Sequence, residues 1–223
     1  MIRTLYHGWL SPFSREVRIV LGEKGLDFDM VVEKVWERRP EFLAMNPTGE
    51  VPVLVETEGQ ILSGAGVICE FLDESHPKDT LIGSDLLVRA ETRRLRDWFG
   101  VKFYTEVTCN LVDEKLYKQF MGMGAPDPVV IRAGHKNLGP NLAYISHLTE
   151  RRRWLAGENF SMADVSAAAQ LSCLDYMDDI PWPEVPAAKD WYARVKSRPS
   201  FRPILEDLIP GLKPPKHYKD LDF

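Results

Sequence analysis

The chain has 223 residues, of which 44% are hydrophobic and 27% charged, a composition typical of globular proteins. Its formal net charge of −5 argues against binding nucleic acid or an anionic membrane through a basic surface, because both of these partners are polyanionic. No apolar run reaches the about 18 residues that a membrane-spanning helix needs, and the first residues lack the apolar stretch of a signal peptide. We therefore expect a cytoplasmic protein with no nucleic-acid or membrane partner.

The three cysteines, Cys69, Cys109 and Cys173, lie far apart in the sequence and form neither a C-x-x-C pair nor a metal-binding pattern. Isolated cysteines in a reducing compartment are usually buried or idle thiols. The sequence therefore predicts no metal site.

The first 32 residues have the pattern of a β-α-β unit. Residues 2–6 and 28–32 are short and rich in β-forming side chains, which predicts two strands. Between them, apolar residues recur at helical spacing from Phe13, with Pro12 in the first turn and Gly25 at the end. A β-α-β order favours a parallel pair of strands.

The next segment completes a small domain with a mixed sheet. Glu58-Gly59 is a turn signal between two short apolar runs, which predicts a hairpin. A polar, proline-bearing stretch from His76 then predicts a domain boundary between about residues 76 and 86, so the first domain spans residues 1–77. The expected elements are a short helix at 37–44, strands at 51–55 and 60–62, and a helix at 66–72.

Beyond the boundary, strand signals almost vanish, and residues 86–208 are expected to form an all-helical domain. Ser161 and Asp164 resemble a capping box, in which Asp164 reaches back to the N–H of Ser161. Residues 209–223 have no helical period and contain Pro214-Pro215, so we expect an extended C-terminal tail. The expected helices are 86–122, 129–150, 165–176 and 191–195.

Four segments in order, residues 11–18, 46–54, 160–164 and 198–201, resemble the signature segments of glutathione transferases. The resemblance covers residues 1 to about 208. It implies a thioredoxin-like N-terminal domain with a mixed four-stranded sheet, a C-terminal helical bundle and a homodimer. It also implies a cis Val51–Pro52 bond, which lets the backbone of Val51 hold the cysteinyl part of glutathione. The alternative for this bond is a trans proline at a strand edge.

The resemblance also implies where catalytic residues would lie. In serine-type members, a hydroxyl near the start of the first helix donates to the glutathione sulfur and lowers the thiol pKa, and the helix N-terminus favours the resulting thiolate. Ser11 matches that position, Ser14 is a second candidate, and Tyr6 is a third. Ser11 could equally be a plain N-cap before Pro12, and the two roles are compatible.

The sequence departs from the family pattern at the start of the third helix. Family members usually carry Glu, Gln or Asp followed by Ser there, to hold the γ-glutamyl group, whereas this chain has Gly64-Ala65. Helix N–H groups remain available for the carboxylate, and Ser63 could take a partial role. Losing the anionic partner of the ligand's ammonium group costs about 1.5–3 kcal/mol. We therefore expect weak or absent glutathione binding.

The Trp36 segment and the Asp220-Leu221-Asp222-Phe223 end resemble one bacterial branch of this superfamily, whose members bind the tubulin-like division GTPase FtsZ and shape its filaments. A tryptophan among charged neighbours is expected to be partly exposed, or else to pack over the small domain. The resemblance implies a non-catalytic dimeric protein without a cofactor. The residues expected to contact the partner are Trp36, Glu114, Arg194, Asp220 and Leu221.

Two other functions are alternatives. The first is a serine-type glutathione S-transferase of detoxification, with Ser11 as the thiol activator and glutathione as co-substrate. The second is a redox protein like thioredoxin, which the sequence disfavours because Ser11 and Ser14 stand where cysteines would be needed.

Overall fold

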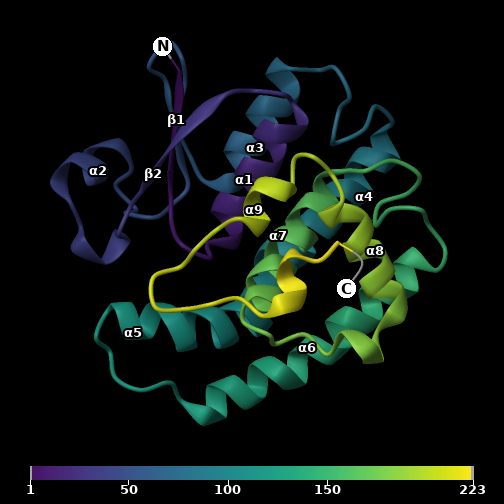
Figure 1. The fold of residues 1–223 in the computed structure, drawn as a ribbon. Coiled ribbons are helices and arrows are strands. Elements are labelled where there is room, and N and C mark those ends of the chain that lie inside the picture. Colours follow the sequence, from purple (N-terminus) through teal and green to yellow (C-terminus); the bar gives the residue numbers. More distant parts are fainter. Residues whose placement is uncertain (1, 222–223) are drawn as a thin grey trace. The chain divides into compact units, whose positions relative to one another are not determined.

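The computed structural model describes residues 2–221, and the chain separates into two compact units between Thr80 and Leu81. Figure 1 shows the strands in the first unit and only helices labelled in the second. Along the chain, a mixed-sheet unit is therefore followed by a helical unit, as predicted.

The first unit contains a four-stranded mixed sheet in the order β2-β1-β3-β4. Strand β1 (Arg3–His7) pairs in parallel with β2 (Phe28–Val32), which confirms the β-α-β opening. On its other side β1 pairs antiparallel with β3 (Val53–Val55), and β3 pairs antiparallel with β4 (Ile61–Ser63). Leu5 and Leu54 face each other at the centre of this sheet and are fully buried, which makes them part of the core.

The helices of the first unit are α1 (Pro12–Glu23), α2 (Pro40–Met45) and α3 (Ala65–Ser75), with a 3₁₀ turn η1 at Val35–Glu37. Helices α1 and α3 pack against each other, because each carries a buried apolar stripe at helical spacing. The stripes are Val17, Val20 and Leu21 on α1, and Ile68, Cys69 and Leu72 on α3.

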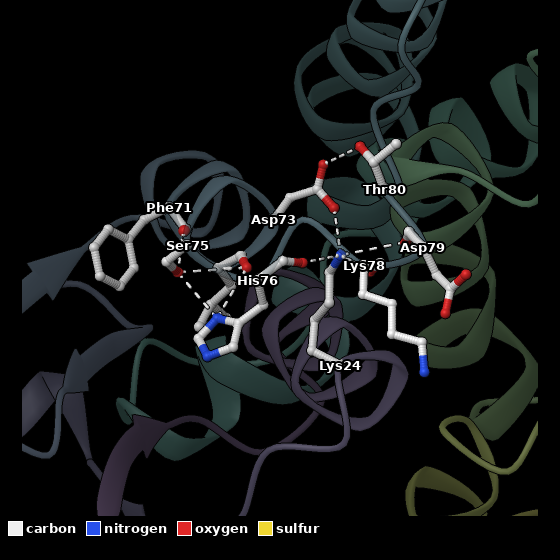
Figure 2. A network of polar contacts seen from close by, with 9 residues as sticks. Lys24, Phe71, Asp73, Ser75, His76, Lys78, Asp79 and Thr80 are labelled. Carbon is white, nitrogen blue, oxygen red and sulfur yellow. Dashed lines mark hydrogen bonds and ion pairs between the residues drawn. The ribbon is translucent and has the colours of Figure 1, made fainter.

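A buried ion pair holds the ends of α1 and α3 together (Figure 2). The Nζ atom of Lys24 lies 2.7 Å from Oδ1 of Asp73, and both side chains are almost completely buried. Oδ2 of Asp73 accepts a 2.7 Å hydrogen bond from the hydroxyl of Thr80. Nζ also donates to the carbonyl oxygens of residues 76, 78 and 79, at 2.9, 3.1 and 3.2 Å. Because a buried charge needs partners on all sides, this network fixes the path of the chain as it leaves the first unit.

The second unit is helical. The predicted helix over 86–122 is a continuous helical run whose middle part, η2, is a π-helix. Helix α7 lies at the centre of the unit, since all of its residues are buried. The elements are α4 (Leu86–Asp97), η2 (Trp98–Tyr117), α5 (Lys118–Phe120), α6 (Pro128–Thr149), α7 (Met162–Tyr176), η3 (Trp182–Glu184), α8 (Pro186–Lys196), α9 (Arg202–Leu205) and η4 (Lys216–Lys219).

The predicted capping box is present at the start of α7, which begins three residues before the predicted start at Val165. Asp164 accepts a 3.0 Å hydrogen bond from the N–H of Ser161. None of the helices in the described residues 2–221 is both long enough and apolar enough to cross a membrane.

The C-terminal segment differs from the extended tail that the sequence predicts. Ile209 and Leu212 form a tight turn, and residues 216–219 form the 3₁₀ turn η4. The reason is the side chain of Tyr218, which is fully buried and pulls the segment onto the helices. Asp222 and Phe223, which belong to the predicted tail, lie outside the described residues.

Candidate functional site

The two candidate hydroxyl groups lie at the start of α1. Ser11 is the N-cap, and its Oγ accepts a 3.2 Å hydrogen bond from the N–H of Ser14. The Oγ of Ser14 accepts a 3.4 Å bond from the N–H of Gly8. This arrangement forms because an N-cap oxygen satisfies a helix N–H that has no partner inside the helix.

The geometry distinguishes the roles that these two serines can take. As an acceptor, Ser11 keeps its own O–H proton to donate, so capping and donation to a thiolate are compatible. Both serines are buried, Ser11 with 6% and Ser14 with 1% of its surface exposed, and Ser14 holds the loop before the helix through its bond with Gly8. Tyr6 lies in β1 with its ring 5.9 Å from that of Phe42. Ser11 is therefore the best candidate for a hydroxyl that meets a ligand.

The peptide bond between Val51 and Pro52 is cis, as predicted. The carbonyl oxygen of Pro52 accepts a 3.1 Å hydrogen bond from the N–H of Gly64, and the next residue, Val53, pairs with Ser63 across the β3–β4 hairpin. The structure thus brings together the two segments, 51–52 and 64–65, that the sequence analysis assigned to one glutathione site.

The start of α3 carries no side chain suited to an ammonium group. Gly64 is the N-cap with φ of +84°, no side chain caps the helix, and its first turn contains no acidic residue. A Cβ placed on Gly64 would meet no atom within 4 Å, so no neighbouring side chain fills the space. The backbone N–H groups of α3 can attract a carboxylate, but the first turn offers nothing that would pair with a cation.

The sequence left open whether Trp36 is partly exposed or packs over the small domain, and in the structure it does both. It lies in η1, is half-buried, and packs its ring 6.5 Å from that of Trp9, so it is supported by the first unit and still reaches the surface. Ion pairs flank it, Lys34 with Glu37 at 3.1 Å and Arg39 with Glu33 at 2.7 Å. Sequence reasoning did not single out Trp9, because nothing in the local pattern links it to a residue 27 positions later.

Glu114 and Arg194 both have partners within the helical unit. One oxygen of Glu114 accepts 2.6 Å hydrogen bonds from the Nζ of Lys118 and from the N–H of Asp127. The hydrogen bond from Lys118 is the main cause that lowers the pKa of Glu114. Arg194 donates a 3.0 Å bond to the carbonyl of Arg153 and lies 5.6 Å from the ring of Trp154. Both side chains are therefore held in place by contacts within the helical unit.

Asp220 and Leu221 directly follow η4. Asp220 is exposed, and Leu221 is half-buried. The buried Tyr218 lies two residues before Asp220 and three before Leu221, and it sets their position. The sequence did not reveal this role.

Two further features of the helical unit escaped sequence reasoning. A groove of about 330 Å³ lies between η2 and α6. The ring of Trp98 lines this groove, and its centroid lies 4.8 Å from that of the Tyr144 ring. The Nε1 of Trp98 donates a 3.0 Å hydrogen bond to Oδ1 of Asn141. The second feature is a buried cluster around Asp175 and Lys196. Among the residues that the structure describes, no group of His, Cys, Asp and Glu is arranged to hold a metal ion.

Two family models match this chain. Residues 5–80 match the model of the glutathione S-transferase N-terminal domain, and residues 132–199 match that of the C-terminal domain. The first match includes Ser11, Pro52 and the start of α3, and the second includes the capping box of α7.

Relatives resemble the chain over its full length. FtsZ-localized protein A of Caulobacter vibrioides is 48% identical over 99% of this chain and 98% of its own. The structure of FzlA from C. crescentus is 47% identical, with a TM-score of 0.97 and complete coverage of both chains. A structure described as a glutathione S-transferase from Rhodospirillum rubrum F11 is 53% identical, with a TM-score of 0.96 and complete coverage of both chains.

Proposed function

Since this chain belongs to the glutathione S-transferase family, we propose that it uses the family fold as a non-catalytic interaction protein that binds filaments of an FtsZ-type division GTPase. The observation that carries this proposal is the 48% identity with FtsZ-localized protein A over nearly the whole of both chains. Because one fold hosts many functions, the full-length relative and the site support this role, whereas the fold alone does not.

The start of α3 supports a role without glutathione. With Gly64-Ala65 at this position and no acidic residue in the first turn, the ammonium group of glutathione has no charged partner there. Glutathione therefore binds weakly or not at all, and a pocket without its co-substrate has no transferase chemistry to perform.

The partner contacts that we propose are Trp36, with its support Trp9, in the first unit, and Glu114, Arg194, Asp220 and Leu221 in the helical unit. Tryptophan and arginine are typical anchors of protein interfaces. Trp36 fits this role because it is half-buried against another ring and flanked by charged residues. We further propose that the protein works in the cytoplasm as a homodimer, which would present each contact twice along a filament.

Co-sedimentation with purified FtsZ filaments tests this function. The wild-type protein should pellet with the filaments, and Trp36→Ala or removal of residues 220–223, which leaves the buried Tyr218 in place, should abolish pelleting while circular dichroism remains native. A suitable control is Glu23→Ala, which changes a charge at a residue outside the proposed contacts. If neither change weakens co-sedimentation, or if the wild-type protein does not pellet, the proposal fails.

The geometry of Ser11 favours one alternative, a serine-type glutathione S-transferase. Its hydroxyl caps α1 as an acceptor and keeps its proton for a thiolate. Isothermal titration calorimetry with millimolar glutathione and a turnover assay with a chlorinated aromatic substrate separate the two functions. A micromolar dissociation constant together with turnover that is lost in Ser11→Ala would establish the enzyme.

A further inference from the structure

Residues 213–221, here called the tail segment, are anchored to the helical unit by an aromatic side chain. Tyr218 is fully buried, and its ring packs edge-on against that of Tyr176 with centroids 5.0 Å apart. Its hydroxyl donates a 3.2 Å hydrogen bond to the carbonyl of Ile204. The ring therefore fills a site between α7 and α9, and its polar end is satisfied there.

A second anchor lies one residue away. The Nζ of Lys196 donates a 3.1 Å hydrogen bond to the carbonyl of His217 and lies 3.8 Å from Oδ2 of Asp175. The Nε2 of His217 lies 3.1 Å from Oδ1 of the same carboxylate. Both Lys196 and Asp175 have completely buried side chains. The tail segment is thus held through its backbone and through a side chain by one buried ion pair.

The cost of this arrangement indicates that the position of the tail segment matters. Burying a lysine and an aspartate demands desolvation of two charges, and an apolar pair would often be at least as stable. A chain end that is disordered in solvent needs neither a buried ion pair nor a buried aromatic ring. The anchors instead fix η4, from which the exposed Asp220 and the half-buried Leu221 follow directly.

We propose that Tyr218 and the Lys196–Asp175 pair position the tail segment so that Asp220 and Leu221 meet the filament in one pre-set orientation. This inference rests on the proposed function, which makes Asp220 and Leu221 partner contacts. Tyr218, Lys196 and Asp175 are positioning residues, because their buried side chains cannot touch a partner themselves. A segment that is ordered before binding avoids the entropy cost that a free tail pays on association.

The first test measures order in the isolated protein. The amides of Tyr218 and Asp220 donate to the carbonyls of Pro215 and His217, so their hydrogen exchange reports whether η4 is formed. Tyr218→Ala should speed this exchange by about tenfold or more without changing exchange in α7 and α8, whereas Tyr218→Phe should keep most protection. The matched control is Lys219→Ala, which removes an exposed ion pair with Glu206 from the same turn.

If Tyr218→Ala unfolds the helical unit, His217→Ala replaces it, because that change removes the contacts of the half-buried imidazole to Asp175 and Asp178 and keeps the buried ring of Tyr218. Unchanged exchange at both amides in the variant used would show that these side chains do not hold the tail segment.

The second test is co-sedimentation of the same variants with FtsZ filaments. Tyr218→Ala should bind about tenfold more weakly, and Lys219→Ala within about twofold of wild type. A released tail with wild-type affinity would overturn the positioning role and leave the proposed function intact. Failure of the wild-type protein to bind would overturn the proposed function, and with it the presentation of Asp220 and Leu221.

Discussion

The indole Nε1 of Trp191 donates a 2.9 Å hydrogen bond to Oδ1 of Asp164, which joins α8 to the first turn of α7 in the interior of the helical unit. The carboxylate also accepts N–H bonds from Leu155 at 2.9 Å and from Ser161 at 3.0 Å, and a hydroxyl bond from Ser161 at 3.0 Å. Burial raises the pKa of Asp164 to about 6, and these donors oppose that rise. One side chain therefore caps α7 and ties three segments of the unit together.

Asp164→Ala should strongly destabilise the protein, because it leaves several buried donors without an acceptor. Each unsatisfied group costs about 1–3 kcal/mol, so the expected loss in the free energy of unfolding is about 3–5 kcal/mol. Guanidinium denaturation measures it. Asp190→Ala, at an exposed position on α8, should change stability by less than about 0.5 kcal/mol. Similar losses in the two variants would contradict this account of α7.

Lys196 should make stability depend on pH in the alkaline range. Burial lowers the pKa of Lys196 to about 8, below the usual lysine value of about 10.5, and Asp175 and Asp220 oppose this shift. Between these values the unfolded chain holds a proton that the folded protein has released. The free energy of unfolding therefore rises with pH in this window, by up to about 1 kcal/mol per pH unit.

Lys196→Met removes the titrating group, so the stability difference between wild type and variant isolates this effect. Denaturation at pH 8, 9 and 10 should give a difference that grows in favour of the wild type. A difference that stays constant or shrinks would show that the ammonium group is not desolvated in the fold.

Glu114→Ala should loosen the connection between α5 and α6. Its carboxylate holds both the side chain of Lys118 and the N–H of Asp127, the two sides of that exposed connection. Amide exchange over residues 119–127 should become several-fold faster. Glu106→Ala provides the control, since the carboxylate of Glu106 pairs with Lys102 within η2. Equal exchange in both variants would rule out this role for Glu114.

Restoring the family side chains at the start of α3 should raise glutathione affinity. A Cβ at Gly64 meets no atom within 4 Å, so the variant Gly64→Glu/Ala65→Ser has room for a carboxylate. The positive φ lowers the stability of the free and the bound variant alike by about 1–3 kcal/mol, so it does not reduce affinity, whereas a charge-assisted hydrogen bond contributes about 1.5–3 kcal/mol to binding. Calorimetry should therefore detect an affinity gain of about tenfold to a hundredfold.

Gly59→Glu is the matched control for that variant. It introduces the same side chain at another glycine with positive φ and open space, in the turn between β3 and β4. It should carry a similar strain without any gain in affinity. An equal gain from both variants would indicate a nonspecific charge effect.

Features that are encoded by neighbouring residues were predicted correctly from the sequence. The β-α-β opening, the hairpin around Gly59 and the capping box of Ser161 and Asp164 depend on residues a few positions apart, and all three are present. The bare start of α3 was also visible, because Gly64-Ala65 can be compared directly with a family motif.

The contacts between residues far apart in the sequence could not be predicted in this way. Trp9 supports Trp36, Lys24 pairs with Asp73, and Lys196 reaches His217, each across a separation that no local pattern spans. The extended tail was expected for the same reason, since nothing around Tyr218 in the sequence marks the site between α7 and α9 that its ring fills.

By itself the sequence determined the family, the two kinds of unit, and the loss of the acidic side chain at residue 64. The tertiary structure determined the partners of the polar side chains: it set the acceptor roles of Ser11 and Ser14 at the start of α1, and it anchored the tail segment through Tyr218. These two groups of features differ in how far apart along the chain the interacting residues lie. Helix periodicity and caps act over one or two turns of the backbone, whereas burial and ion pairing depend on which distant segments the folded chain brings into contact.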